Sequence, residues 1–155
     1  MRHVPVIAVS LWLGMMGFFA FVVAPAAFGT LERESAGRLV TAVFPRYYGM
    51  GVALGLLALA ALIWRSGGGR GGVDWVPLAL VALMMVLTVY AMAVLAPQAE
   101  AAWAAVRAAR SEGVPTAEAL RFARLHRLSG ILNLVVMGAG VVLVALEAVR
   151  GRGGS

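Results

Sequence analysis

Long apolar runs separated by short polar segments dominate the pattern of this chain. A membrane-spanning helix takes roughly 20 residues at 1.5 Å of rise each. Four runs meet that length, and they define spans at about residues 4–28, 46–65, 74–96 and 127–149. The polar segments 30–45 and 97–126 then lie at one membrane interface. The pattern predicts an all-α membrane protein: one transmembrane four-helix bundle over residues 1–155, with an extra short interfacial helix and a last helix that projects from the membrane.

Prolines and capping residues indicate where these helices begin and end. Pro45 is expected to stop the short interfacial helix, because the residue before a proline avoids helical backbone. Pro25 and Pro97 are expected to kink or end their spans, since proline has no N–H to donate. Asp74 suits the N-cap of the third span, and Thr116 suits that of the last helix.

Glycine and helix length add to this picture. The segments 66–72 and 112–115 predict a loop and a turn, and the tail 151–155 reads as disordered. The last helix, from Thr116 to about Val149, would be roughly 51 Å long. The hydrocarbon core is only about 30 Å thick, so the first turns of this helix must lie outside it.

Two pairs of small residues predict close helix packing. Gly51 and Gly55 have the small-xxx-small spacing, and Gly14 and Gly17 share one face of the first span. Such faces can receive a neighbouring helix of the same chain. They can also dock a second copy or another membrane protein, which would make the chain a scaffold or a subunit.

Composition supports the membrane interpretation and excludes several chemistries. Of the 155 residues, 62% are hydrophobic and 13% are charged, too little polar surface for a water-soluble globule. There is no cysteine and no lysine, which excludes thiolate and Schiff-base chemistry. The net charge of +6 does not indicate nucleic-acid binding. The arginines lie at the ends of the spans, where they meet anionic lipid headgroups.

The expected location is the cell membrane, crossed several times. Four spans place both termini and the 66–72 segment on one side. Counting basic residues in short flanks favours cytoplasmic termini, although the total number of arginines is higher on the other side.

Charged and aromatic residues gather at the interface opposite the termini and form a predicted rim. This rim could bind a small anion, an ion or a polar headgroup. It could equally be a solvated belt whose exposed ion pairs contribute about 0–1 kcal/mol each. The rim consists of Glu32, Arg33, Glu34, Arg38, Arg46, Tyr47, Arg121, Arg124, His126 and Arg127.

A polar stripe enters the last span from this rim. His126, Gly130, Asn133, Met137 and Gly140 lie within about 60° of one line on a helical wheel. Asn133 is expected to face the bundle interior, because an unpaired amide in hydrocarbon is costly. The ordinary use of such an amide is a hydrogen bond between helices.

His126 is the best single candidate for chemistry. A neutral imidazole binds haem iron or copper, and it also titrates near neutral pH. A metal site needs further ligands, and one histidine does not supply them. A structural hydrogen bond and proton handling are the alternatives. No set of nucleophile, base and orienting group can be assembled, so we expect a non-enzymatic protein. Glu147 is expected to pair with Arg150 or to reach the interface.

Two motifs resemble a known family. The segments FFAFVVAPAAFGTLERESAG (18–37) and VFPRYY (43–48) are similar to the opening of the family around eukaryotic transmembrane protein 205. An H-x-x-S-x-x-x-N pattern, matched by His126, Ser129 and Asn133, opens the last span. The resemblance implies four transmembrane helices and no established activity. A more distant similarity to copper-resistance D-like proteins, which include a haem-dependent protoporphyrinogen oxidase, raises haem or copper at His126.

Three hypotheses follow for function. The first is a small ligand or ion that is bound or transported at the rim, with Arg33, Arg46, Tyr47, His126, Ser129 and Asn133 as candidate binding residues. The second is a haem or copper protein that uses His126. The third is a membrane scaffold or subunit, possible as a homo-oligomer or with another membrane protein.

Overall fold

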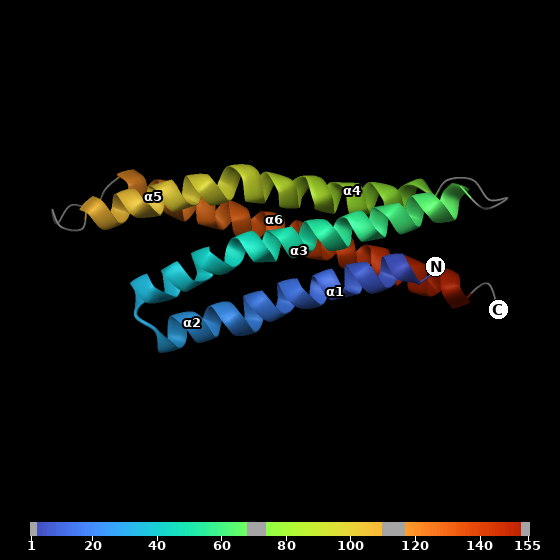
Figure 1. Cartoon of the computed structure of the whole chain (residues 1–155), viewed down its shortest axis with the longest axis horizontal. Coiled ribbons are helices and arrows are strands. Elements are labelled where there is room, and N and C mark those ends of the chain that lie inside the picture. The colour runs from blue at the N-terminus through green and yellow to red at the C-terminus, as the bar shows by residue number, and fades with distance from the viewer. Residues whose placement is uncertain (1–2, 68–73, 110–116, 153–155) are drawn as a thin grey trace.

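The computed structural model describes residues 3–67, 74–109 and 117–152, and every regular element in these ranges is helical. The elements form four rods, drawn in Figure 1. They are α1 (Val4–Phe18), η1 (Phe19–Val23) and α2 (Ala24–Thr30); α3 (Arg33–Gly67); α4 (Trp75–Tyr90), η2 (Ala91–Leu95) and α5 (Ala96–Ala109); and α6 (Ala117–Arg152). The expected loop at 66–72 and tail at 151–155 are wrong at their starts, because α3 includes Ser66 and Gly67 and α6 runs to Arg152. The rest of both segments, the turn at 112–115 and the cap at Thr116 lie outside the described residues.

The four rods run alternately up and down and form one bundle. Each of α1, α3, α4 and α6 packs against the next, and α6 closes the ring against α1. The diagonal pairs are therefore α1 with α4 and α3 with α6. We call the end that carries Val4, Ser66, Trp75 and Arg150 the terminal end, and the opposite one the distal end (Figure 1).

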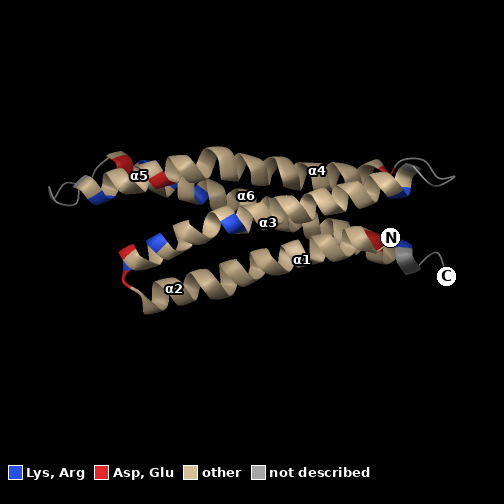
Figure 2. Cartoon of the chain, in the orientation of Figure 1, with Lys and Arg blue, Asp and Glu red and all other residues tan. Residues whose placement is uncertain are grey.

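All four rods are long and apolar enough to cross a membrane, as the sequence predicted. The candidate spans are Val4–Thr30, Arg33–Ser66, Trp75–Ala108 and Ala117–Arg150. Charged residues gather toward the two ends, with a long uncharged stretch between them (Figure 2). A lipid bilayer around this stretch accounts for the many large apolar side chains that face outward.

The expected separate interfacial helix is wrong in one respect, because α3 does not stop at Pro45. The helix runs without interruption from Arg33 to Gly67, with Pro45 inside it. Proline removes one backbone donor, but membrane helices tolerate this where other groups bind the freed carbonyls. The carbonyl that loses its helical donor at Pro45 is that of Thr41. The side chain of Arg46 bonds the next carbonyl along, since its Nη1 donates to the carbonyl of Ala42 at 3.1 Å. The segment 33–45 is therefore the first part of a long rod.

Pro25 and Pro97 do not end their rods either. Each is preceded by a π-helical turn, Phe19–Val23 or Ala91–Leu95. The wider turn lets the N–H before each proline bond five residues back, from Ala24 to Phe19 and from Ala96 to Ala91. Single π-turns of this kind bend a helix without leaving its backbone unpaired.

The two halves of the chain repeat one packing register. Pro5 and Pro77 are separated by the same number of residues as the two π-turns, and Pro25 and Pro97 have this separation too. The same interval relates buried residues of α1 to buried residues of α4. These pairs are Val9 with Val81, Trp12 with Met84, and Met16 with Thr88. The fold thus consists of two similar helical hairpins, α1–α3 and α4–α6.

Small residues on α3 and α6 set the closest approaches in the core. A Cβ added at Gly51 would lie 2.8 Å from Nε1 of Trp12, and one added at Gly55 would collide with Met85. A Cβ at Gly140 would lie 2.8 Å from Cδ2 of Leu13. The predicted small-xxx-small contact on α3 is therefore confirmed, but its partners belong to the same chain. Docking of another protein at Gly51 is excluded by Trp12.

The other predicted glycine contact does not form. Gly14 has nothing within 4 Å of an added Cβ, and Gly17 would meet only Phe21 of its own rod. The neighbouring Phe18 and Phe21 are exposed. This face of α1 and η1 is directed toward lipid rather than toward the bundle.

A smaller second core holds the distal end together. Leu95, Ala102 and Leu125 are buried there, and the ring of Phe122 lies 5.1 Å from that of Trp103. The close contact with α3 is made at Gly37, where an added Cβ would lie 3.6 Å from Nε1 of Trp103. The packed pair of α5 and the start of α6 therefore extends the bundle at this end, and the start of α3 contacts it at Gly37. The first turns of α6, which the sequence predicts to lie outside the membrane, belong to this part of the bundle.

The packing at Gly51 generates a prediction for stability. Gly51→Ala should lower the free energy of unfolding by about 1–3 kcal/mol, because the rigid indole of Trp12 cannot yield to the added methyl group. The matched control is Gly138→Ala, at a position with open space around it. It should be neutral or stabilising, since alanine favours helix over glycine. Unfolding in mixed micelles, followed by circular dichroism, measures both; equal effects would contradict the packing account.

Candidate functional site

The lengths of α3 and α6 place two charged layers at the distance of a membrane. Both helices run from the distal to the terminal end, and an ion pair between Arg65 and Glu147 sets them at a common level. Counting back from this pair, the helical rise puts Arg46 about 28 Å away on α3 and Arg127 about 30 Å away on α6. These separations match the thickness of the hydrocarbon core of a bilayer, about 30 Å. We call Arg46, His126 and Arg127 the distal boundary layer.

The candidates on α3 occupy different environments. Arg33 and Arg46 are exposed, whereas Tyr47 is buried. The Tyr47 ring lies 5.1 Å from that of Phe19 and 5.3 Å from that of Tyr48, inside an aromatic cluster between α3 and η1. Tyr47 therefore packs the core, while Arg46, about 100° around the helix from it, is exposed. Arg33 lies about 20 Å from Arg46 along the helix, too far to share a small ligand.

The candidates on α6 follow the predicted stripe from the surface inward. His126 is exposed and stacks on Phe122, with ring centroids 6.0 Å apart. Ser129 and Asn133 are half-buried, and Gly140 is buried against α1 and α4. The expected interhelical hydrogen bond of Asn133 is not formed with any described residue.

The six candidates do not converge on one pocket. No hydrogen bond, ion pair or ring contact between any two of them occurs in the described ranges. Arg46 and His126 lie on diagonal helices, and both are exposed. The boundary layer is therefore a belt of separate positions around the bundle.

A metal ion at His126 would have no cluster of further histidine or acidic ligands in the described part of the chain. No group of three or more His, Asp or Glu side chains that could hold a metal ion occurs there. A single exposed imidazole does not fit the three or four ligands of a protein metal centre.

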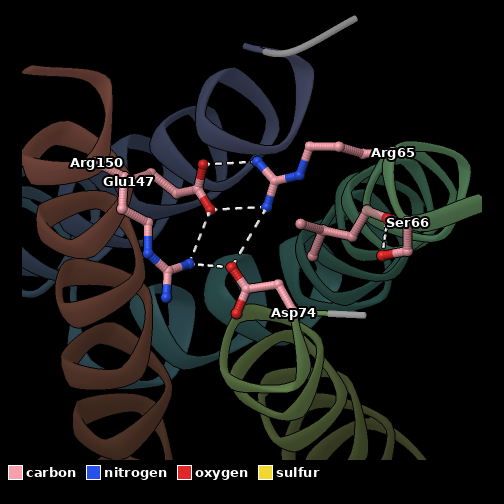
Figure 3. Close-up of polar contacts among 6 residues, drawn as sticks. Arg65, Ser66, Asp74, Glu147 and Arg150 are labelled. Carbon is pink, nitrogen blue, oxygen red and sulfur yellow. Dashed lines mark hydrogen bonds and ion pairs between the residues drawn. The ribbon is translucent and has the colours of Figure 1, made fainter. Parts of the chain in front are cut away.

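Sequence reasoning missed a cluster of four charges at the terminal end, drawn in Figure 3. Arg65 binds Glu147 through two hydrogen bonds, Nη1 to Oε2 at 2.7 Å and Nη2 to Oε1 at 2.9 Å. Arg150 contacts both Asp74 and Glu147, and Asp74 lies 4.0 Å from Arg65. The Glu147 side chain is only 8% exposed. The cluster joins α3, α6 and the start of α4 across the bundle.

Part of this cluster was visible in the sequence. The expected contact of Glu147 with Arg150 is present, at 3.8 Å. Its closer partner, Arg65, belongs to a helix far away in sequence, and local spacing cannot reveal it. Asp74 holds the predicted N-cap position, but its side chain makes no capping hydrogen bond. The carboxylate binds the arginines instead.

Comparison with known proteins identifies a family without assigning an activity. A family model described as "Domain of unknown function (DUF4149)" matches residues 7–108. An uncharacterized protein of Aquifex aeolicus (strain VF5) is 42% identical over 59 residues, which are 38% of this chain and 43% of the relative's length. No solved structure matches. The matched range includes Arg33, Arg46 and Tyr47 and ends before His126, Ser129 and Asn133.

The terminal cluster yields a second prediction. Glu147→Gln should destabilise the bundle by about 3 kcal/mol, because it removes the carboxylate that binds Arg65 through two hydrogen bonds, at a position where the side chain is only 8% exposed. A double-mutant cycle with Arg65→Gln should recover most of that loss as coupling energy. The control cycle uses Arg38 and Glu34, whose side chains are 65% and 52% exposed. That pair should couple by less than about 1 kcal/mol. Similar coupling in the two cycles would refute a special role for the terminal cluster.

Proposed function

This chain belongs to the DUF4149 family, whose function is unknown, and we propose that it is a non-enzymatic integral membrane protein that binds anionic headgroups at its distal boundary layer. The ligand class is a phosphate group carried by a membrane lipid. Arg46 and Arg127 supply the charge.

One observation carries the proposal: the arginines at the two membrane boundaries differ in how they are compensated. At the terminal boundary, Arg65 and Arg150 are paired with Glu147 and Asp74. At the distal boundary, Arg46 and Arg127 form no ion pair with any described acidic residue. Of the described arginines, the two at the terminal boundary are thus neutralised by acidic residues of the same chain, and Arg46 and Arg127 at the distal boundary are not.

The chemistry of the distal layer suits a phosphate. A guanidinium presents a planar set of N–H donors that matches two phosphate oxygens at once. Because Arg46 and Arg127 lie on diagonal helices and are exposed, each would meet its own headgroup. The imidazole of His126 lies at the same level as Arg127, and it could add a hydrogen bond there. Ser129 and Asn133 follow it toward the hydrocarbon.

Orientation belongs to the same proposal. Cytoplasmic termini remain our inference from the basic residues in the short flanks. The distal extension would then project from the outer face of the cell membrane. The resemblance to the transmembrane protein 205 family is consistent with this topology, and it adds no activity.

The third prediction concerns lipid binding. The double variant Arg46→Gln/Arg127→Gln should retain less phosphatidylglycerol than the wild type when the protein is titrated in micelles and bound lipids are counted by native mass spectrometry. Each lost charge-assisted contact should weaken binding by roughly tenfold. Phosphatidylcholine binding should change less, because its headgroup carries no net charge.

Arg33→Gln is the matched control, because Arg33 is also exposed and forms no ion pair with a described residue, but lies outside the boundary layer. It should leave lipid binding unchanged. If Arg33→Gln lowers phosphatidylglycerol binding as much as the double variant does, net charge accounts for binding and the boundary layer does not.

A further inference from the structure

A shallow apolar groove runs between α1 and α3 on the outside of the bundle. It has a volume of about 350 Å³, and its lining residues are Leu11 and Met15 of α1 and Met50, Ala53 and Leu54 of α3. Leu11, Met50 and Ala53 are exposed. The small side chain of Ala53 lies among four larger ones, which leaves the hollow between the two helices.

The groove lies inside the hydrocarbon layer. Met50 and Leu54 lie about 6 and 12 Å from Arg46 toward the middle of the bundle. The level on α1 agrees, since Trp12 packs against Gly51. The groove is therefore in contact with lipid tails.

Arg46 stands at the distal mouth of this groove. Arg46, Met50, Ala53 and Leu54 lie within about 100° of one another around α3. The guanidinium is bonded to the carbonyl of Ala42, one turn farther toward the distal end, so it points out of the hydrocarbon. Its remaining N–H donors are available to a group at headgroup level. The guanidinium of Arg46 and the apolar groove therefore follow each other along one face of α3.

We propose that this face holds one anionic phospholipid, with its phosphate on Arg46 and an acyl chain in the groove between α1 and α3. The inference rests on the proposed function, and it adds a defined site for one lipid molecule. A phospholipid has a charged headgroup followed by apolar acyl chains, and the arginine followed by the groove matches this order. A soluble phosphate would use the arginine but not the groove.

The charge at the mouth decides between lipid classes. No described acidic side chain neutralises Arg46, and the groove itself is lined by apolar residues. A headgroup with net negative charge therefore gains more at this site than a zwitterionic one. The occupant is an anionic lipid such as phosphatidylglycerol.

Photocrosslinking tests the site directly. The probe is phosphatidylglycerol with a diazirine on its acyl chain, added to the full chain in micelles, with the labelled residues identified by mass spectrometry. Labels should fall on the groove residues. Unlabelled phosphatidylglycerol should compete roughly tenfold better than phosphatidylcholine. Arg46→Gln and Ala53→Leu should each reduce groove labelling by about the same factor, the first by removing the charge and the second by filling the hollow.

Two controls make the result specific. Ala60→Leu adds the same bulk on the same face of α3, two turns away from the groove, and should leave labelling unchanged. Arg127→Gln removes an arginine at the same level on α6, and should leave groove labelling unchanged as well. Circular dichroism checks that each variant is folded, and the competition on wild-type protein needs no variant.

The outcomes separate this site from the proposed function. If Arg46→Gln weakens phosphatidylglycerol binding but Ala53→Leu leaves groove labelling intact, headgroup binding stands and the groove site is overturned. If Ala53→Leu abolishes labelling while Arg46→Gln and the choice of competitor have no effect, the groove takes any acyl chain. That result overturns the anionic-lipid site and Arg46's part in the proposed function.

Discussion

The bidentate ion pair between Arg65 and Glu147 is the constraint on which the axial arrangement depends. The two residues lie on diagonal helices that run in the same direction, so their contact sets α3 and α6 at a common level. Glu147 is nearly buried, and a buried carboxylate without a partner is costly, so this level is strongly preferred. All distances to the distal layer follow from it. Among the described residues, Arg65 and Arg150 at the terminal boundary are consequently paired with acidic side chains, whereas Arg46 and Arg127 at the distal boundary form no ion pair.

Much of this architecture could be predicted from the sequence. Apolar length alone located four spans, and the Gly51–Gly55 spacing located the closest contact in the core, although not its partner Trp12. The continuity of α3 through Pro45 could not be predicted. The start of the helix packs at Gly37 against Trp103, a tertiary contact that local sequence does not reveal. The pair of Arg65 with Glu147 was hidden for a similar reason, because it is created by tertiary register.

The candidate site also has features that could be predicted from the sequence and features that could not. Residue type and position at a span boundary pointed to Arg46, and its exposure is consistent with binding. Tyr47, next in sequence, was grouped with it, but helical geometry turns Tyr47 into the aromatic cluster with Phe19. The expected convergence of Arg33 and His126 with Arg46 required a compact rim. The long rods and the distal extension separate these residues instead, so the surface suits several lipid headgroups better than one soluble ligand.

The central claim is that the hydrocarbon ends at Arg46 and that α3 continues into water beyond it. Because the chain contains no cysteine, single spin labels can be placed at exposed positions of α3 without a competing thiol. Leu39→Cys and Leu57→Cys bracket the boundary, and both native side chains are exposed. In reconstituted bilayers, the label at position 39 should be accessible to a water-soluble nickel complex, and the label at position 57 to dissolved oxygen. Equal oxygen accessibility at the two positions would place residue 39 in lipid and contradict the account.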